Sequence, residues 1–415
     1  MNNNSKKVHI VGGGISGLIT ATVLEKYNIN SLIIEQSDTL GGRIKTDIFN
    51  KYQLDHGFQV LLSSYEAAKK YLDYESLNLQ KLEAGACIFQ NGKQNYFGDP
   101  LRNSSLLFPT FFSKIGSLSD KIKIAKLNFK LQKKTIDSIF KEKETSTLNY
   151  LTNCGFSSMV IDNFFKPFFS GIFLETELDT SSRMFEFVFK MFGDGLAVIP
   201  KNGIQEIVNQ LKYKLKITTI RFNSTVTSIK NKKIHLSNGE ILQSDYTIIA
   251  TEPTEIIENL NNQKISWKSC QNLYFSTPKR LYKKAFIGLI PDQESLINNI
   301  FYPTSIQTNF KGDNELLSVT VIKKHNYSDK ELILKVKKEL DILCKIKNVT
   351  FLKLYHIDKA LPNLNNLEYE ISPTETKLKE GIYLAGDVLL NASLNAAIIS
   401  GERAALAVIN AMNDS

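Results

Sequence analysis

Cysteine and histidine are both scarce in this chain of 415 residues. The four cysteines lie far apart and none forms a C-x-x-C pair, which argues against a disulfide framework and against a cysteine-based zinc site. The five histidines are equally scattered, so we expect no metal centre. Isolated cysteines favour a reducing compartment, and we expect a cytoplasmic protein.

Long apolar runs are absent as well. No segment offers the roughly 18 uninterrupted apolar residues that a membrane-spanning helix needs. The polar start, residues 1–7, lacks the apolar core of a signal peptide. One short apolar run, Leu106–Phe112, lies near basic residues and indicates at most a weak peripheral contact with a membrane.

Acidic residues are outnumbered, because 51 Lys and Arg stand against 42 Asp and Glu and give a formal net charge of +9. A basic balance favours anionic partners in general. Many of the lysines stand in mixed stretches such as 121–134, which is typical of a solvated face. We therefore expect a small-molecule partner and no nucleic acid.

The richest signal is a glycine cluster near the start. Val8–Val11 is short and apolar like a buried parallel strand, and the glycines follow it at once. Leu18–Tyr27 then has the apolar pattern of a helix, and Ser31–Glu35 predicts a second strand that ends in an acid. Strand, glycine turn, helix, strand and acid together predict a dinucleotide-binding unit.

Each position of this motif has a physical role. Gly12 permits a tight turn, Gly14 lets the backbone approach a pyrophosphate, and Gly17 lets the helix pack closely. Glu35 lies 18 residues after Gly17 and would accept hydrogen bonds from a ribose diol. The phosphates would lie at the helix N-terminus, whose free N–H groups favour negative charge, at Ile15 and Ser16.

A second glycine pair follows the acid at Gly41 and Gly42, with Arg43 directly after it. This turn would bring backbone and a guanidinium to the pyrophosphate from the other side. The combination resembles the flavin-containing amine oxidase superfamily, which includes phytoene desaturase-like and protoporphyrinogen oxidase-like enzymes. The resemblance implies FAD as the cofactor. The family usually has an arginine two positions before the glycine pair, where this chain has Thr39.

Leu54–Leu62 also resembles the superfamily, in which an Asp-x-Gly turn runs beside the flavin ring. Gly57 would allow a close backbone approach, with Phe58 next to it. An ordinary strand turn is the competing interpretation. His56 could act as a base, although a histidine in a turn is more often simply exposed.

Two later stretches complete the resemblance. Val226 would contact the adenine through its backbone, or simply belong to the core. Gly381–Asp387 predicts a strand that ends in Gly386 and Asp387, and the resemblance places this aspartate at the ribityl chain or the phosphates. Residues 393–411 predict a helix rich in small residues, whose N-terminus near Asn395 would point to the pyrimidine edge of the flavin.

The fold class expected is α/β, or α+β overall. A Rossmann-like FAD/NAD(P)-binding domain, discontinuous in sequence, would comprise 1–75, 200–255 and 350–415. The substrate domain would comprise 76–199, mainly helical, and 256–349, an antiparallel sheet with a helix at Ser328–Leu343. The phenylalanines between 164 and 192 would line an apolar pocket or form core.

The resulting hypothesis is a FAD-dependent oxidoreductase of the oxidase or desaturase type. It would transfer a hydride from a C–C or C–N bond of an apolar substrate to flavin N5. A polyamine-type amine oxidase is one alternative, and a flavin-dependent isomerase without net redox change is another. No motif identifies a catalytic side chain, although Lys268 corresponds in rough position to a lysine of some amine oxidases. The electron acceptor stays open.

Overall fold

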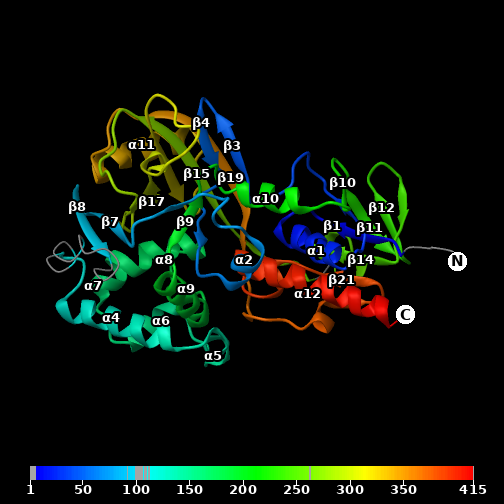
Figure 1. Ribbon diagram of the computed structural model, residues 1–415. Helices are drawn as coiled ribbons and strands as arrows, with labels where there is room; N and C mark the ends of the chain where they lie inside the picture. The colour runs from blue at the N-terminus through cyan, green and yellow to red at the C-terminus, as the bar shows by residue number, and fades with distance from the viewer. Residues whose placement is uncertain are drawn as a thin grey trace.

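A computed structural model describes residues 6–90, 92–98, 106, 110, 113–260 and 263–414. A six-stranded sheet forms one end of the molecule, at the right of Figure 1. Five of its strands are parallel, and only the edge strand β20 runs antiparallel to its neighbour. In sheet order the strands are β10 (Thr219–Arg221), β2 (Ser31–Ile34), β1 (Val8–Val11), β14 (Tyr246–Ile249), β21 (Ile382–Leu384) and β20 (Lys377–Lys379).

These strands come from three distant parts of the chain, which confirms the discontinuous Rossmann-like unit. β1 and β14 are buried along their whole length, as their β-branched residues predict for central parallel strands. A three-stranded antiparallel meander covers the same end. It comprises β11 (Val226–Lys230), β12 (Lys233–Leu236) and β13 (Ile241–Gln243).

Three helices pack beside this sheet: α1 (Ile15–Lys26), α10 (Glu206–Lys214) and α12 (Leu394–Asn413). Helices α1 and α12 approach each other closely, since a Cβ added to Gly401 would lie 2.4 Å from the carbonyl oxygen of Ser16. Thr20 on α1 also donates a hydrogen bond of 3.0 Å to the carbonyl of Gly401. The small residues of α12 therefore serve helix-to-helix packing.

A seven-stranded mixed sheet forms the second unit, at the upper left of Figure 1. Only the pairing of β16 with β7 is parallel. In sheet order the strands are β19 (Thr350–Pro362), β15 (Trp267–Thr277), β18 (Glu315–Val321), β17 (Ile297–Phe301), β16 (Ile287–Leu289), β7 (Gly85–Gln90) and β8 (Lys93–Gly98). Helix α11 (Asp329–Cys344) packs on it close to the range predicted for it, and begins at a capping box between Ser328 and Glu331.

One predicted boundary differs from the structure. Residues 350–362 were assigned to the nucleotide unit, whereas β19 pairs with β15 along its length. The nucleotide sheet resumes only at its edge strand β20, after a loop and a short 3-10 turn, and nothing in the alternation of β19 distinguishes the two sheets. Strand character also begins earlier than predicted, since β6 (Leu79–Lys81) and β7 precede the helices of the first substrate segment.

A helical layer occupies the lower left of Figure 1. It contains α4 (Leu118–Lys133), α5 (Ile136–Lys141), α6 (Thr147–Asn153), α7 (Ser158–Val160), a π-helical turn at Ile161–Phe165, α8 (Lys166–Phe173) and α9 (Ser182–Asp194). Short pieces connect the units: β3 (Thr46–Phe49), β4 (Tyr52–Asp55), β5 (Leu61–Leu62), α2 (Glu66–Tyr71) and β9 (Ala197–Pro200).

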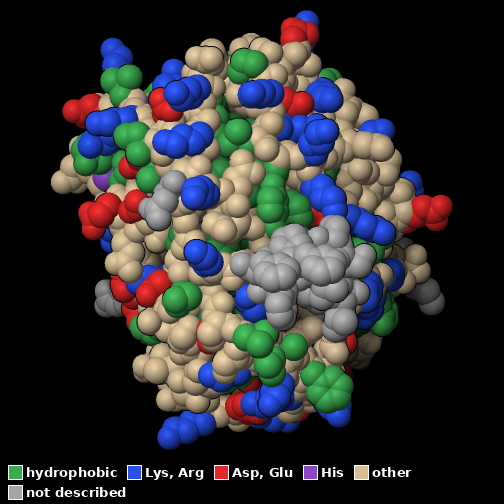
Figure 2. Space-filling model, turned by 90° about the vertical axis from the view of Figure 1, so that its left-hand side faces the viewer, with side chains coloured by type: hydrophobic (Ala, Val, Ile, Leu, Met, Phe, Trp, Pro, Cys, Tyr) green, Lys and Arg blue, Asp and Glu red, His purple; other side chains and the backbone are tan. Residues whose placement is uncertain are grey.

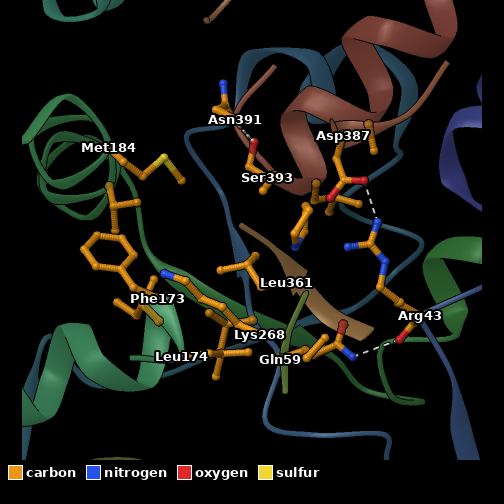
Figure 3. A pocket seen from close by; sticks show the side chains of 18 of the residues that line it. Arg43, Gln59, Phe173, Leu174, Met184, Lys268, Leu361, Asp387, Asn391 and Ser393 are labelled. Carbon is orange, nitrogen blue, oxygen red and sulfur yellow. Dashed lines mark hydrogen bonds and ion pairs between the residues drawn. The ribbon is translucent and has the colours of Figure 1, made fainter. Parts of the chain in front are cut away.

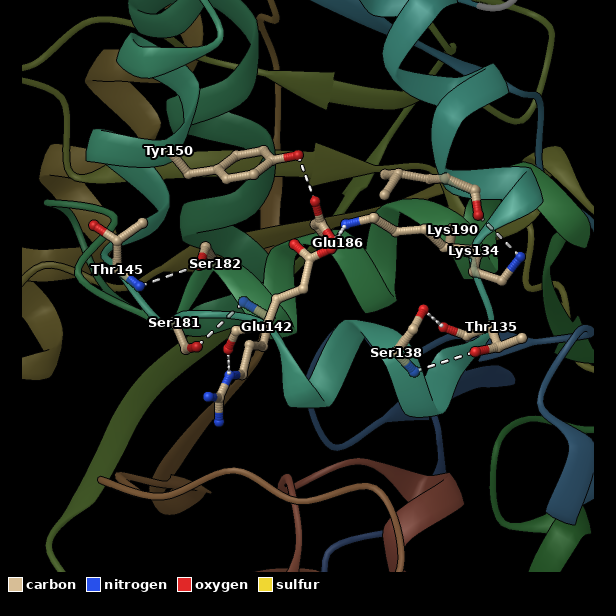
Figure 4. Close-up of polar contacts among 12 residues, drawn as sticks. Lys134, Thr135, Ser138, Glu142, Thr145, Tyr150, Ser181, Ser182, Glu186 and Lys190 are labelled. Carbon is tan, nitrogen blue, oxygen red and sulfur yellow. Dashed lines mark hydrogen bonds and ion pairs between the residues drawn. The ribbon is translucent and has the colours of Figure 1, made fainter.

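A buried polar network holds these helices together (Figure 4). The Glu186 carboxylate accepts hydrogen bonds of 2.6 Å from the Tyr150 hydroxyl and from Lys134. Lys190 donates to the carbonyls of Leu131 and Gln132, at the C-terminal end of α4. Burial, and then the Glu186 carboxylate, raise the pKa of Tyr150 well above its usual value. A cation at the negative end of the α4 dipole stabilises that helix.

Candidate active site

One large cavity, about 1900 Å³ in volume, runs from the glycine turns of the nucleotide unit to the aromatic helices α8 and α9. Pockets for a single small molecule are typically about 300–1,000 Å³. The cavity therefore has room for a dinucleotide and a second molecule together.

A carboxylate accepts a hydrogen bond from the first glycine turn and fixes its conformation. Gly12 has φ +106°, a conformation that favours glycine, and Glu35 Oε2 accepts a hydrogen bond of 2.7 Å from the N–H of Gly13. The other Glu35 oxygen accepts from the backbone and hydroxyl of Ser37. Glu35 lines the cavity, and it also fixes the shape of the turn, a role that its position in the motif does not reveal.

The N-terminus of α1 opens onto the cavity. Its N-cap residue is Gly14, and no side chain caps the helix there. A Cβ added to Gly14 would meet nothing within 4 Å, while Ile15 and Ser16 form part of the wall. Backbone N–H groups at an uncapped helix start are suited to an anion. Gly17 lies behind them, where a Cβ would approach the Gly12 carbonyl oxygen to 2.1 Å, so its role is close packing.

The second glycine turn lies directly against the first. The N–H of Gly41 donates to the carbonyl of Gly13 at 2.9 Å, and a Cβ on Gly42 would lie 3.6 Å from the Cα of Gly14. Both glycines have positive φ, +123° at Gly41 and +59° at Gly42. The two turns together make a floor without side chains, which leaves backbone accessible from the cavity.

Arg43 and Asp387 form an ion pair of 2.5 Å at this floor (Figure 3). The Asp387 side chain is only 5% exposed, whereas that of Arg43 is 40% exposed. The Arg43 guanidinium also lies 5.3 Å from the Trp267 ring, in cation–π geometry. The sequence assigned the two residues separate contacts with a cofactor, and the structure brings them together.

The start of α12 forms another part of the wall. Gly386, with φ +149°, donates its N–H to the Ser400 hydroxyl at 3.0 Å. Leu394 and Ala397 face the cavity. Asn395 stands at this predicted helix start. Its buried side chain points to α2 and accepts a hydrogen bond of 3.1 Å from the N–H of Ala67, so only its backbone is left for the role expected at the flavin. One residue along a helix rotates a side chain by about 100°, which takes Asn395 off the cavity face.

The Asp-x-Gly turn also reaches the cavity, through His56, Gly57 and Phe58. Gly57 has φ +93°, and a Cβ there would lie 3.0 Å from Ile357 on β19. His56 Nε2 lies 3.0 Å from Asp47 Oδ2, which also accepts a hydrogen bond of 2.8 Å from the Tyr355 hydroxyl. His56 is thus half-buried beside a carboxylate on β3, which the competing view of a freely exposed histidine did not predict.

Asp55, the first residue of this turn, is turned away from the cavity into the protein. It accepts from the Thr46 hydroxyl at 2.6 Å and from the N–H of Ile204 at 3.1 Å. Burial raises the pKa of Asp55 to about 6, against the effect of these hydrogen bonds. The residue ties the β3–β4 hairpin to the segment before α10.

Val226, expected at an adenine, is buried and lines the cavity together with its neighbours Thr225 and Thr227. Its core and cavity interpretations are therefore compatible.

The far end of the cavity is aromatic. Its wall includes Phe164, Phe168, Phe169, Phe173, Phe189 and Phe192. Phe165, Phe185 and Phe187 are fully buried in the core. The phenylalanine-rich stretch thus supplies both wall and core, as its two interpretations allowed.

One ion pair interrupts this apolar end. Lys268 Nζ on β15 lies 2.5 Å from Glu175 Oε2 and donates to the Thr180 hydroxyl at 3.1 Å. Figure 3 shows the lysine directed toward Phe173 and Leu174. Glu175 and Thr180 were missed by the sequence analysis, because they belong to no motif and only the fold brings them to Lys268.

Comparison with known proteins agrees with this geometry. A family model described as flavin containing amine oxidoreductase matches residues 15–409. The chain belongs to this family. It is a flavin-dependent oxidoreductase.

Individual relatives of this flavin oxidoreductase are distant. Coproporphyrinogen III oxidase of Bacillus subtilis (strain 168) is 24% identical over 299 residues, which span 61% of this chain and 61% of that protein. The matched region is thus less than two thirds of that relative. A putative protoporphyrinogen oxidase from Exiguobacterium sp. 255-15 has the same fold, with a TM-score of 0.71 at 16% identity over 98% of this chain and 99% of the other. Putrescine oxidase bound to putrescine matches with a TM-score of 0.69 at 16% identity, over 98% and 99%.

The residues of this flavin oxidoreductase fit the cofactor that its family implies. The floor between Gly14 and Gly42 is bare backbone, and the uncapped start of α1 offers N–H groups to a pyrophosphate. The described residues contain no group of three or more potential metal ligands close together. Within that same part of the chain, no helix is both long and apolar enough to cross a membrane.

Proposed function

We propose that the flavin is FAD and that the enzyme oxidises an apolar small molecule held at the aromatic end of the cavity. The observation that carries the proposal is the continuity of the cavity, from the glycine turns to the Phe168 and Phe173 wall. A dinucleotide bound at one end would place its ring toward the other, where a second molecule has room.

The adenosine half of FAD would lie near Glu35 and Val226, and the pyrophosphate between the start of α1 and the Gly41–Arg43 turn. The ring would lie between Gly57 and the start of α12. When bound there, FAD would supply the hydride acceptor for oxidation of a C–C or C–N single bond of the substrate, the hydride leaving from a C–H of that bond. The chain's own residues orient both molecules, and the phenylalanine wall excludes water from the reacting bond.

A second candidate, an amine oxidase, is favoured by the carboxylates on the cavity wall. Glu144, Glu175 and Asp179 line the helical side of the cavity and would attract an ammonium group. Lys268 already neutralises Glu175, which favours the apolar substrate class.

The first experiment is an absorbance spectrum of the purified protein, followed by acid release and separation of FAD from FMN. Bands of oxidised flavin and release of FAD are expected. Protein that is colourless and cannot be reconstituted with FAD would contradict the proposal.

The second experiment is anaerobic reduction with apolar and amine substrates in turn. Bleaching of the flavin by apolar compounds supports the first candidate, and bleaching by amines alone supports the second. Conversion of a substrate without any net consumption of an electron acceptor would identify an isomerase instead.

A further inference from the structure

Helix α4 carries two apolar stripes on opposite sides. One stripe, with Leu127 and Leu131, is buried in the helical layer. The other comprises Leu118, Ile122, Ala125 and Phe129, which follow one another at intervals of four, three and four residues and so share one face. Leu118 is 55% exposed, Ile122 48% and Phe129 60%. A surface helix normally shows polar residues on its outer face, so this exposed stripe is unusual.

The exposed stripe borders the mouth of the cavity. Ala125 and Phe129 belong both to the stripe and to the cavity wall. Lys121, Asn128 and Gln132, on the adjacent face of the helix, also line the cavity. Around the circumference of α4, the cavity face and the apolar stripe are therefore neighbours.

Lysines flank the stripe on its other side. Lys126, Lys130 and Lys133 are exposed and recur at intervals of four and three residues. Lys133 Nζ lies 4.1 Å from the centre of the Phe129 ring, so its stem follows the stripe. Figure 2 shows apolar and basic side chains together on the face of the molecule that carries this helix.

The helix has little negative charge to offset these lysines. α4 contains five lysines and one aspartate. That aspartate, Asp120, is buried and occupied by the capping box with Ser117 and by hydrogen bonds from Ser157. The outer surface of α4 is therefore both apolar and strongly basic.

We propose that α4 docks on an anionic lipid surface, with its stripe among the upper acyl chains and its lysine row at the headgroups. An apolar stripe beside a row of flexible cations is the pattern of a helix that lies in a membrane interface. A symmetric contact between two copies of this chain would place the same lysine row close to itself, which like charges oppose. The charge pattern thus favours lipid over a second copy.

This surface differs from the apolar run expected at Leu106–Phe112. That run lies outside the described residues except for Leu106 and Thr110, and both of these are buried. The docking of α4 is independent of the reaction. If the proposed function also holds, an apolar substrate would pass from the lipid directly over Ala125 and Phe129 into the cavity.

The test is flotation of the flavin-loaded protein with vesicles of phosphatidylcholine alone or of phosphatidylcholine with phosphatidylglycerol. We expect the wild-type protein to float with the anionic vesicles and to stay largely unbound with the neutral ones. Leu118→Ser with Ile122→Ser, two positions outside the cavity wall, should weaken binding by about tenfold or more. Replacing Lys126, Lys130 and Lys133 by Gln should lower the affinity for the anionic vesicles by about fivefold for each lysine.

The matched control is Leu334→Ser on α11, where a leucine that is 67% exposed also stands among lysines but away from the cavity. Its binding should equal that of the wild type. Flavin content and melting temperature show whether each variant is folded. Wild-type protein that fails to float, equal binding to neutral vesicles, or full binding by the Leu118 and Ile122 double variant would overturn the proposal. A dimer that only this double variant dissociates would assign the stripe to a second copy and overturn it too.

Discussion

Arg43 and Asp387 are separated by 344 residues in sequence and meet in an ion pair of 2.5 Å at the cavity floor. The pair joins the second glycine turn to the segment between β21 and α12. The carboxylate is nearly inaccessible, so its partner compensates a charge that water does not reach. The flavin site is therefore built from residues near both ends of the chain.

Removing either partner should therefore weaken flavin binding. We expect Arg43→Met and Asp387→Asn each to raise the Kd for flavin by about tenfold, because each disturbs the same wall. The double variant should lose less binding free energy for flavin than the two single variants lose together, since the two residues act as a unit. Fluorescence titration of the apoprotein measures this, and strictly additive losses would show that the two residues act separately.

Two glycines of the first turn should respond differently to the same substitution. Gly14→Val fills open cavity space and should reduce bound flavin by more than about tenfold with little change in melting temperature, because its φ of −75° suits any residue. Gly17→Val should instead destabilise the fold, since its Cβ would contact the Gly12 carbonyl. Flavin content and thermal unfolding distinguish the outcomes. Wild-type flavin content in Gly14→Val would refute the phosphate assignment.

Glu35 should be tested for both of its roles. Glu35→Ala removes the acceptor of the Gly13 N–H and any contact with a ribose, so we expect a loss of about 1–3 kcal/mol in flavin affinity. Glu35→Gln keeps an oxygen that can accept from the Gly13 N–H, so it should lose less flavin affinity. Equal losses in the two variants would mean that charge, and not the support of the turn, dominates.

The raised pKa of Asp55 predicts a pH dependence of stability. The folded state holds this proton more tightly than the unfolded chain, whose aspartates titrate near 3.8. The carboxyl therefore contributes stability that is fully present below about pH 4 and is lost as pH rises through about 6. Its size is at most about 3 kcal/mol, since each pKa unit corresponds to about 1.4 kcal/mol.

Asp55→Asn is the matching variant, because an amide oxygen can still accept from Thr46 and Ile204. The stability of the wild type relative to Asp55→Asn should be greatest near pH 4 and should decline toward pH 7. Denaturant unfolding at several pH values measures this difference. A difference that grows with pH would show that the carboxylate is stabilised in the fold.

Lys190→Met should destabilise the helical layer by about 2 kcal/mol, because the C-terminal carbonyls of α4 lose their cation. For comparison, Lys141→Met breaks an exposed pair with Asp137 on α5 and should have almost no effect. Thermal unfolding of both variants provides the measurement. Similar melting temperatures for the two variants would show that Lys190 does not stabilise the C-terminal end of α4.

The sequence predicted the nucleotide unit well because its elements obey local rules. A buried strand, a turn that needs glycine and an acid at a strand end each leave a mark within about 30 residues. The same local logic located Gly386 and Asp387 at the end of β21. The contacts between these motifs, such as Gly41 with Gly13, follow from the fold and not from either motif alone.

The errors have physical causes of the same kind. β19 alternates like any strand, and its sheet is decided by a partner, β15, that lies about 80 residues earlier in the chain. The helix start at Asn395 agrees with the sequence, but the direction of the Asn395 side chain depends on how α12 is rotated against α2, which no local pattern gives. The Lys268, Glu175 and Thr180 cluster joins a strand to a helical loop across the cavity. Local patterns carry no information on such pairings.

The parallel sheet places β14 between β1 and β21, whose residues are separated by most of the chain. During synthesis on a ribosome, the first glycine turn emerges long before the strand and helix that complete its surroundings. A nascent chain therefore presents Gly12–Gly17 without the Asp387 wall and without α12 against α1. We therefore expect flavin capture to be a late event of biosynthesis, and a chain that terminates before residue 387 should leave the ribosome without its chromophore.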